Sequence, residues 1–286
     1  MTLTITDAAL KYAEVQDGRI AYREYGIENG GLPLVLLSRF RGTIDDWDAA
    51  VVNRLAADRH VVAFDSSGVG LSEGRVPATV TAMADTAIAF IDALGLQKAD
   101  LLGFSMGGYI GQRIALKRPD LVHALVLVGT GPGGGEGATY PGSVVADSLE
   151  MNPLDALQAL FFTSSRAGRV AAEGYFERTN TASRPEGSTV TEEASTVQRA
   201  AILKWWNGDD STISELDQIQ VPVLVVNGSD DVMVPTPNAF LMSQRIPNAQ
   251  LVIYPDAGHG SLFQYPVTFT RHVLQFLEAQ VEGGIA

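Results

Sequence analysis

A serine set between glycines is the first feature of this chain with the means to do chemistry. Residues 103–108 read Gly-Phe-Ser-Met-Gly-Gly, which gives the spacing G-x-S-x-G around Ser105. An apolar run at 99–102 precedes this segment, and residues 109–116 place apolar side chains at helical spacing after it. A strand-to-helix corner of this kind presents a serine hydroxyl over the end of a sheet, where it can act as a nucleophile.

The residues around Ser105 suit that chemistry. Glycines at 103 and 107 let the chain turn sharply and let neighbouring backbone approach, which a Cβ atom would block. The helix that follows would direct its first N–H groups, beginning with Met106, at the place where a negatively charged oxygen would form. We therefore predict that Met106 supplies one donor of an oxyanion hole.

A serine hydroxyl needs a neighbouring base to take its proton, and histidine is the usual choice. The chain has four histidines, and only His259 lies in a loop flanked by glycines after the last predicted strand. His60 opens a strand, His123 precedes one, and His272 lies in the final helix. We expect these other three to be surface or structural histidines.

The elements that must position these residues alternate between apolar strands and helices. An Asp-Gly pair at 17–18 predicts a hairpin between 11–15 and 19–25. Further strands are predicted at 32–38, 60–65, 99–102, 124–128, 223–226 and 250–254, and helices at 44–57, 79–94, 109–118, 237–245 and 266–281. This alternation predicts an α/β fold with a mostly parallel, doubly wound sheet.

One segment breaks the alternation. From the glycine-rich corner after Gly129 to about residue 214, the sequence predicts helices and no strand. The expected helices are 144–149, 155–162, 167–179 and 192–206. We therefore expect a core domain formed by residues 1–130 and 215–286, and a helical cap formed by the insertion 131–214.

Four motifs in this order resemble the α/β-hydrolase superfamily. They are the Ser105 corner, the glycine-bearing turn at 64–72, Gly-Ser-Asp-Asp-Val-Met-Val-Pro at 228–235, and Ala-Gly-His-Gly at 257–260. The resemblance covers nearly the whole chain. The amino-acid sequence around Ser105 is similar to that of serine esterases and cofactor-free haloperoxidases within the superfamily.

The resemblance implies a role for each member of a triad. In the superfamily the order along the chain is nucleophile, acid, then base, which makes Ser105 the nucleophile and His259 the base. The pattern G-x-x-D followed by Val-Pro selects Asp231 as the acid that orients His259, in preference to its neighbour Asp230. Asp65 is then expected to stabilise its own turn.

The second oxyanion donor is expected from the loop after the strand at 32–38. Related enzymes carry a His-Gly-x motif there, whereas this chain reads Ser-Arg-Phe-Arg-Gly-Thr at 38–43. Alignment of the phenylalanine with the usual donor selects Phe40, within a register uncertain by one residue. The departure from the motif puts two arginines beside the predicted hole.

Arg39 and Arg41 allow two interpretations. They brace the loop through carboxylates such as Asp45 or Asp65, or a guanidinium faces the pocket and favours an anionic substrate. Both arginines are candidate substrate-binding residues.

Apolar residues of the insertion are candidates for the roof of the pocket. The insertion offers Met151, Leu154, Leu157, Phe161, Phe162, Trp205 and Trp206, although residues at helical spacing also pack against a core. From these we select Phe161 and Trp205 as substrate-binding candidates. Met233 lies beside the predicted acid, and Leu262 follows the predicted base. We expect an apolar, medium-sized pocket for a small apolar or amphipathic substrate.

Composition limits the other function classes. A net charge of −13 argues against nucleic acid or an anionic membrane as partner. The absence of cysteine rules out a thiol nucleophile, and no residues have metal-ligand spacing, so neither metal nor cofactor is expected. With no leader and no long apolar run evident, we expect a cytoplasmic protein, either a monomer or a homodimer.

These observations favour a serine hydrolase that cleaves a carboxylic ester or lactone through an acyl-enzyme. Two other enzymes use the same triad, namely a cofactor-free perhydrolase of the haloperoxidase type and a C–C bond hydrolase. A small-molecule binding protein with the same fold is the alternative without catalysis. The natural substrate and the size of its acyl or alcohol part are not given by the sequence.

Overall fold

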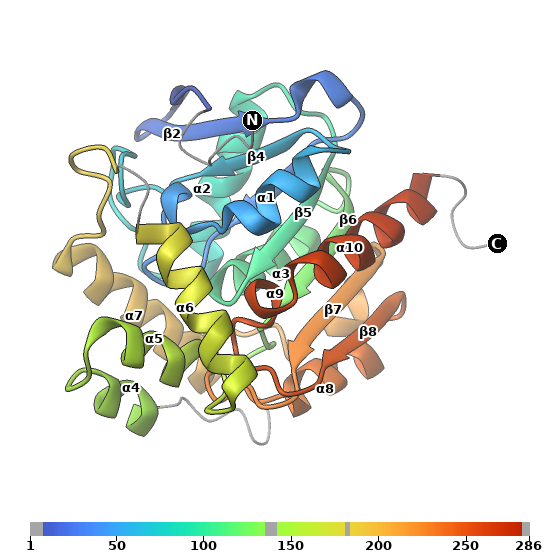
Figure 1. Cartoon of the computed structure of the whole chain (residues 1–286). Helices are drawn as coiled ribbons and strands as arrows, with labels where there is room; N and C mark the ends of the chain where they lie inside the picture. Colours follow the sequence, from blue (N-terminus) through green and yellow to red (C-terminus); the bar gives the residue numbers. More distant parts are fainter. Residues whose placement is uncertain (1–7, 135–141, 181–183, 282–286) are drawn as a thin grey trace.

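An eight-stranded sheet forms the centre of the computed structural model, which describes residues 8–134, 142–180 and 184–281 (Figure 1). The strands are β1 (Lys11–Val15), β2 (Gly18–Tyr25), β3 (Leu34–Leu37), β4 (Val61–Phe64), β5 (Ala99–Phe104), β6 (Val122–Val128), β7 (Val223–Gly228) and β8 (Ala249–Tyr254). Their order is β1-β2-β4-β3-β5-β6-β7-β8. The first two pairs, β1 with β2 and β2 with β4, are antiparallel, and every other pair is parallel. The predicted α/β fold with a mostly parallel sheet is confirmed.

The inner strands are apolar because helices cover both of their faces. All four residues of β3 are buried, as are all four of β4 and all six of β5. Since side chains alternate along a strand, Leu34 and Leu36 enter one hydrophobic core, and Val35 and Leu37 enter the other.

Helices complete each of these two cores. On one face lie α1 (Ala49–Ala56), α9 (Ser261–Gln264) and α10 (Pro266–Val281). On the other lie α2 (Val80–Ala93), α3 (Met106–Lys117) and α8 (Pro237–Arg245). Figure 1 shows α1 and α10 in front of the sheet and α2 and α3 behind it. The sheet is therefore doubly wound, as predicted.

The single helix predicted at 44–57 is divided in two. A 3-10 turn, Ile44–Asp46, is followed by two extended residues before α1 begins. The Asp46 carboxylate accepts the Thr43 N–H at 2.8 Å and closes the first turn. Asp48 then caps α1 by accepting the Ala50 N–H at 2.8 Å, so each aspartate starts its own helical segment. The remaining 3-10 turns are Ile27–Asn29 and Leu216–Gln218.

Four helices lie between β6 and β7. They are α4 (Gly142–Ser148), α5 (Pro153–Phe161), α6 (Arg166–Asn180) and α7 (Glu192–Asn207). Figure 1 shows them grouped together at the lower left of the molecule. They occupy the part of the chain where the sequence predicts helices without strands, and the described residues between β6 and β7 contain no strand.

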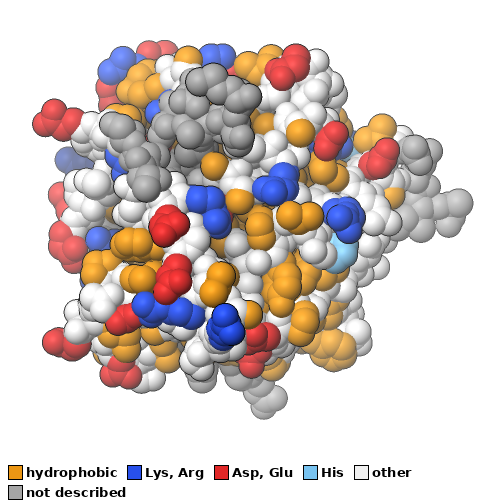
Figure 2. Space-filling model, in the orientation of Figure 1, with side chains coloured by type: hydrophobic (Ala, Val, Ile, Leu, Met, Phe, Trp, Pro, Cys, Tyr) orange, Lys and Arg blue, Asp and Glu red, His pale blue; other side chains and the backbone are white. Residues whose placement is uncertain are grey.

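The outer surface mixes charge types. On the face seen in Figure 2, acidic and basic side chains are interspersed among hydrophobic ones. Over the described ranges, no helix has both the length and the apolar character needed to cross a bilayer.

Candidate active site

Ser105 lies at the sharp corner between β5 and α3. Its backbone has φ 56° and ψ −118°, a conformation that residues with a side chain rarely adopt. Two hydrogen bonds hold it there, because the Ser105 N–H donates to the Val128 carbonyl at 2.9 Å and the Thr130 hydroxyl donates to the Ser105 carbonyl at 2.9 Å. Strained backbone that its surroundings fix in this way is common at functional sites.

The corner requires glycine on both sides of Ser105. A Cβ atom on Gly103 would lie 2.4 Å from the Gly107 carbonyl oxygen. A Cβ atom on Gly107 would lie 2.0 Å from the Leu37 carbonyl oxygen. Both distances are far below van der Waals contact, so only glycine lets α3 approach β3 and β5 this closely.

His259 and Asp231 form a buried pair. The Nδ1 atom of His259 lies 2.9 Å from Oδ2 of Asp231, and both side chains are almost fully buried. The other carboxylate oxygen, Oδ1, accepts the N–H groups of Met233 and Val234, each at 2.8 Å. Because an ionised carboxylate only accepts hydrogen bonds, Nδ1 donates to it, and Nε2 is left to face other groups.

The neighbouring carboxylate has a different environment. Asp230 is exposed, its side chain lies beside the Ser229 hydroxyl, and its N–H donates to the Ala257 carbonyl at 2.9 Å. Of the two aspartates considered for the acid, Asp231 is therefore the one in contact with His259.

Asp65 holds two loops together. Its carboxylate accepts the N–H of Ile44 and the N–H of Leu71, each at 2.8 Å. Burial raises the pKa of Asp65 to about 7, even though both backbone hydrogen bonds oppose that rise. The contacts fit the turn-stabilising role expected for this residue.

The other histidines each contact a polar partner away from Ser105. His60 meets Glu24, His123 meets Asp100, and His272 meets Tyr254, each at 2.8 Å. Of the four histidines, only His259 lines a cavity with Ser105.

That cavity has a volume of about 240 Å³. Five other residues predicted for the site line it with Ser105 and His259, namely Arg39, Phe40, Arg41, Phe161 and Met233. The lining residues that the sequence analysis did not single out are Tyr109, Val145, Ser148, Leu149, Leu160, Arg199, Ile202 and Val234. Trp206, which was named among the apolar residues of the insertion, also lines the cavity. The spacing of 199, 202 and 206 along α7 places these residues on one helix face, which is a signal available from the sequence.

Two predicted pocket residues lie behind the cavity wall instead. Trp205 is fully buried, stacks on Tyr109 with ring centroids 4.9 Å apart, and donates its Nε1–H to the Gly131 carbonyl at 3.2 Å. Its neighbour Trp206 lines the cavity, because one step along a helix turns the side chain by about 100°. Leu262 is fully buried in the core beneath α9.

Among the described residues, no protein acceptor pairs with either of the two N–H groups predicted to bind an oxyanion. Met106 is the first residue of α3, and the first N–H groups of a helix have no carbonyl within it to receive them. Over the described part of the chain, the Phe40 N–H likewise donates to no protein acceptor. The Met106 side chain itself is buried outside the cavity.

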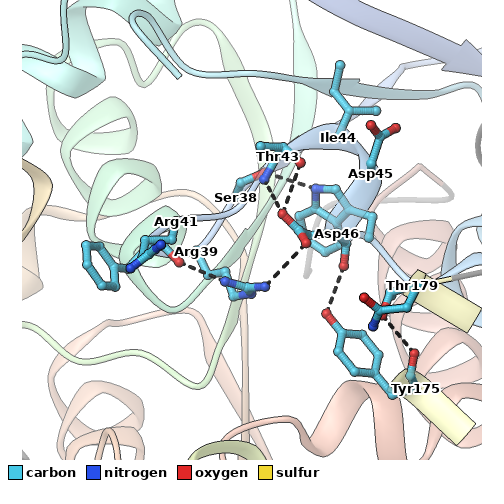
Figure 3. A network of polar contacts seen from close by, with 12 residues as sticks. Ser38, Arg39, Arg41, Thr43, Ile44, Asp45, Asp46, Tyr175 and Thr179 are labelled. Carbon is cyan, nitrogen blue, oxygen red and sulfur yellow. Dashed lines mark hydrogen bonds and ion pairs between the residues drawn. The ribbon is translucent and has the colours of Figure 1, made fainter. Parts of the chain in front are cut away.

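A network of polar contacts braces the loop that contains Phe40 (Figure 3). The Arg39 guanidinium donates to the Phe40 carbonyl at 2.9 Å and lies 3.7 Å from the Asp46 carboxylate. From the segment between β6 and β7, the Tyr175 hydroxyl donates to the Asp46 carbonyl at 2.9 Å, and Arg184 donates to the Asp46 carboxylate at 3.0 Å. The expected brace is therefore present for Arg39, through Asp46.

The charges of this network decide how Asp46 titrates. Burial works to raise the pKa of Asp46, but the guanidinium groups of Arg39 and Arg184 outweigh it and hold the pKa below its usual value. The carboxylates named in the prediction, Asp45 and Asp65, are not the partners of Arg39. Burial raises the pKa of Asp45.

No metal centre accompanies these residues. Over the described ranges, no three His, Asp or Glu side chains come together in a way that would hold a metal ion.

Comparisons with known proteins identify the fold family of the chain. A family model described as alpha/beta hydrolase fold matches residues 33–266. A putative carbamate hydrolase RutD from Pseudomonas savastanoi pv. phaseolicola is 30% identical over 258 residues, which is 88% of this chain and 96% of the relative. An alpha/beta hydrolase fold protein from Chitinophaga pinensis superimposes with a TM-score of 0.90 at 35% identity, covering 96% of this chain and 99% of that one. Est816, described as an N-acyl homoserine lactone degrading enzyme, superimposes on this chain with a TM-score of 0.71 at 26% identity. The superposition covers 93% of this chain and 100% of the Est816 chain.

Proposed function

Because this chain belongs to the α/β-hydrolase fold family, we propose that it is a serine hydrolase that cleaves a carboxylic ester or lactone through an acyl-enzyme. The observation that supports this most is the buried pair of His259 and Asp231, 2.9 Å apart, in one cavity with Ser105. The likeness to Est816, described as an N-acyl homoserine lactone degrading enzyme, supports a lactone as the substrate.

In the first half of the proposed reaction, Ser105 Oγ attacks the substrate carbonyl carbon while His259 Nε2 takes the hydroxyl proton. Asp231 stabilises the imidazolium that forms. The N–H groups of Phe40 and Met106 bind the oxygen that becomes negative. Collapse of this intermediate breaks the bond to the alcohol oxygen, which takes the proton back from His259.

In the second half, water replaces the alcohol. His259 removes a proton from the water as its oxygen attacks the acyl carbon, and the same two N–H groups bind the second oxyanion. The bond to Ser105 Oγ then breaks, and the serine recovers its proton from His259 while the acid leaves. With a lactone, the alcohol and the acid belong to one product molecule.

The cavity supports a small, amphipathic substrate. Its walls are mostly apolar, and α4, α5 and α7 supply much of its lining. We assign these helices to a cap formed by residues 131–214 over a core of residues 1–130 and 215–286. In this proposal the cap excludes water from Ser105 and selects the substrate by shape.

Carbamate hydrolysis is a second candidate, and the likeness to the putative carbamate hydrolase favours it. The same serine, base and oxyanion donors would act on a carbamate carbonyl, and the acyl-enzyme would then carry a carbamoyl group. A carbamate ester therefore belongs in the substrate panel beside carboxylic esters and lactones.

The test is labelling by a fluorophosphonate, read as intact mass. We expect one adduct on the wild type and none on Ser105→Ala. A serine outside the cavity, Ser243 on α8, supplies the matched control, and Ser243→Ala should label as the wild type does. A folded wild type that takes no label would contradict the proposal. Turnover of a panel of ester, lactone, carbamate and diketone substrates then identifies the bond cleaved.

A further inference from the structure

The described charged side chains that line the cavity, outside His259, are all arginines. Arg39, Arg41 and Arg199 line it with Ser105 and His259, and the described residues of its wall include no Asp or Glu. The whole chain has 33 acidic residues against 20 Lys and Arg, and the outer face in Figure 2 mixes the two signs. The cavity therefore concentrates positive charge in an acidic protein.

One of the three arginines is already engaged. The Arg39 guanidinium lies beside Asp46, as Figure 3 shows. It also donates to the Phe40 carbonyl and lies over the Phe161 ring, with 5.3 Å between Cζ and the ring centroid. These contacts neutralise and fix its charge, so Arg39 is a brace for the loop.

Arg41 differs from Arg39, because its backbone is held in place while its guanidinium has no charged partner among the described residues. Its φ of 55° lies in the left-handed region, and its N–H donates to Oε1 of Gln198 at 3.0 Å. Gln198 is buried and Arg41 is exposed, so this hydrogen bond is partly shielded from water. In the described part of the chain, the Arg41 guanidinium meets no carboxylate and makes no hydrogen bond. Arg41 is exposed to solvent and lines the cavity, so the bond to Gln198 fixes the backbone that carries an unneutralised arginine at the cavity wall.

Arg199 follows Gln198 directly on α7. Its closest carboxylate is that of Glu192 at 3.8 Å, and both side chains are more than half exposed, so this pair is weak. Gln198 thus ties the Arg41 loop to the helix that contributes the second arginine. The two guanidinium groups approach one cavity from elements that are fastened to each other.

We propose that Arg41 and Arg199 form a subsite for a carboxylate of the substrate. This inference rests on the proposed function and adds to it the substrate class: an ester or lactone that also bears a free carboxylate. A guanidinium matches the planar geometry of a carboxylate and keeps its charge at any physiological pH. The rest of the wall is largely apolar, with Val145, Leu149, Leu160, Ile202, Trp206 and Met233. Because burying charge among apolar side chains is costly, this wall favours a ligand group with one negative charge, such as a carboxylate, over a phosphate with two.

The test compares two substrates that differ only in charge. Mono-4-nitrophenyl adipate has a free carboxylate, and its terminal amide has nearly the same shape. We expect the wild type to favour the adipate in kcat/KM by about tenfold, the effect of one hydrogen bond to a charged group. Arg41→Met and Arg199→Met should each reduce this ratio, and the double variant should bring it to about one. Arg245→Met, an exposed arginine of α8 outside the cavity, should keep the wild-type ratio.

The two proposals fail in different ways. If the wild type hydrolyses both esters with the same kcat/KM, the hydrolase stands and the carboxylate subsite is overturned. If it hydrolyses neither, binding to Ser105→Ala by calorimetry decides the subsite alone. Tighter binding of the adipate than of the amide, lost when Arg41→Met and Arg199→Met are added, would support it. Equal binding of the two would overturn it.

Discussion

The substitution Asp231→Asn tests the proposed mechanism most directly, because the structure fixes how the new amide would lie. Oδ1 of Asp231 accepts two backbone N–H groups, from Met233 and Val234. An amide NH2 cannot replace that oxygen, since it would set donors against donors. The amide oxygen therefore stays at Oδ1, and the NH2 group faces Nδ1 of His259.

That orientation reverses the hydrogen bond to the base. Nδ1 of His259 must now accept from the amide, so the ring hydrogen moves to Nε2, which is the atom that should receive the Ser105 proton. The base is then blocked and the positive charge on its ring loses its carboxylate. The same change in a serine protease lowers kcat about 10⁴-fold, and at 1.36 kcal/mol for each tenfold this is about 5.4 kcal/mol of transition-state stabilisation.

The assay is kcat/KM on 4-nitrophenyl butyrate for the wild type, Asp231→Asn and Asp230→Asn, with circular dichroism to verify folding. Asp230 is adjacent, exposed and without contact to His259, so its variant should stay within about twofold of the wild type. A folded Asp231→Asn that loses less than about tenfold would refute the reasoning. A large loss in Asp230→Asn instead would exchange the roles of the two aspartates.

Two further predictions concern stability. Asp65 has a pKa of about 7 in the folded protein, against an ordinary value of 3.8. Between these two pH values the folded protein holds a proton on Asp65 that the unfolded chain releases. The contribution of Asp65 to the free energy of unfolding should therefore fall as the pH rises from about 4 to about 7. Urea unfolding of the wild type and Asp65→Asn between pH 4.5 and 8 measures this, and a difference between them that is constant with pH would contradict it. Tyr175→Phe removes the hydroxyl that donates to the Asp46 carbonyl and should lower the free energy of unfolding by about 1 kcal/mol. If the variant unfolds at the same urea midpoint as the wild type, the proposed brace between α6 and the Asp46 turn is contradicted.

The sequence predicted those features of the fold that depend on local pattern. Continuous apolar runs identified β3 to β6, and the helical spacing after Ser105 identified α3. The division of the 44–57 helix was missed because it depends on where Asp46 and Asp48 find their partners, and one partner of Asp48 is Arg178, 130 residues away. Tertiary contacts of this kind leave no trace in a local pattern.

Site residues were predictable where a motif marks them and less so where only packing decides. The 228–235 and 257–260 motifs identified Asp231 and His259, which the structure brings into contact. Trp205 and Trp206 look alike in sequence, and only the rotation of α7 against α3 decides which of them faces the cavity. Arg199 was missed because an exposed arginine on a helix ordinarily faces solvent.

The bond between Arg41 and Gln198 has a consequence for the order of events in folding. It joins residues 157 positions apart. Closing a loop of that length costs chain entropy, which the docking of α7 must offset. During synthesis on the ribosome, Arg41 precedes Gln198 by 157 residues, so the Phe40 loop cannot reach its final conformation before α7 has been made. The chain therefore completes its predicted oxyanion loop only with residues that it receives much later.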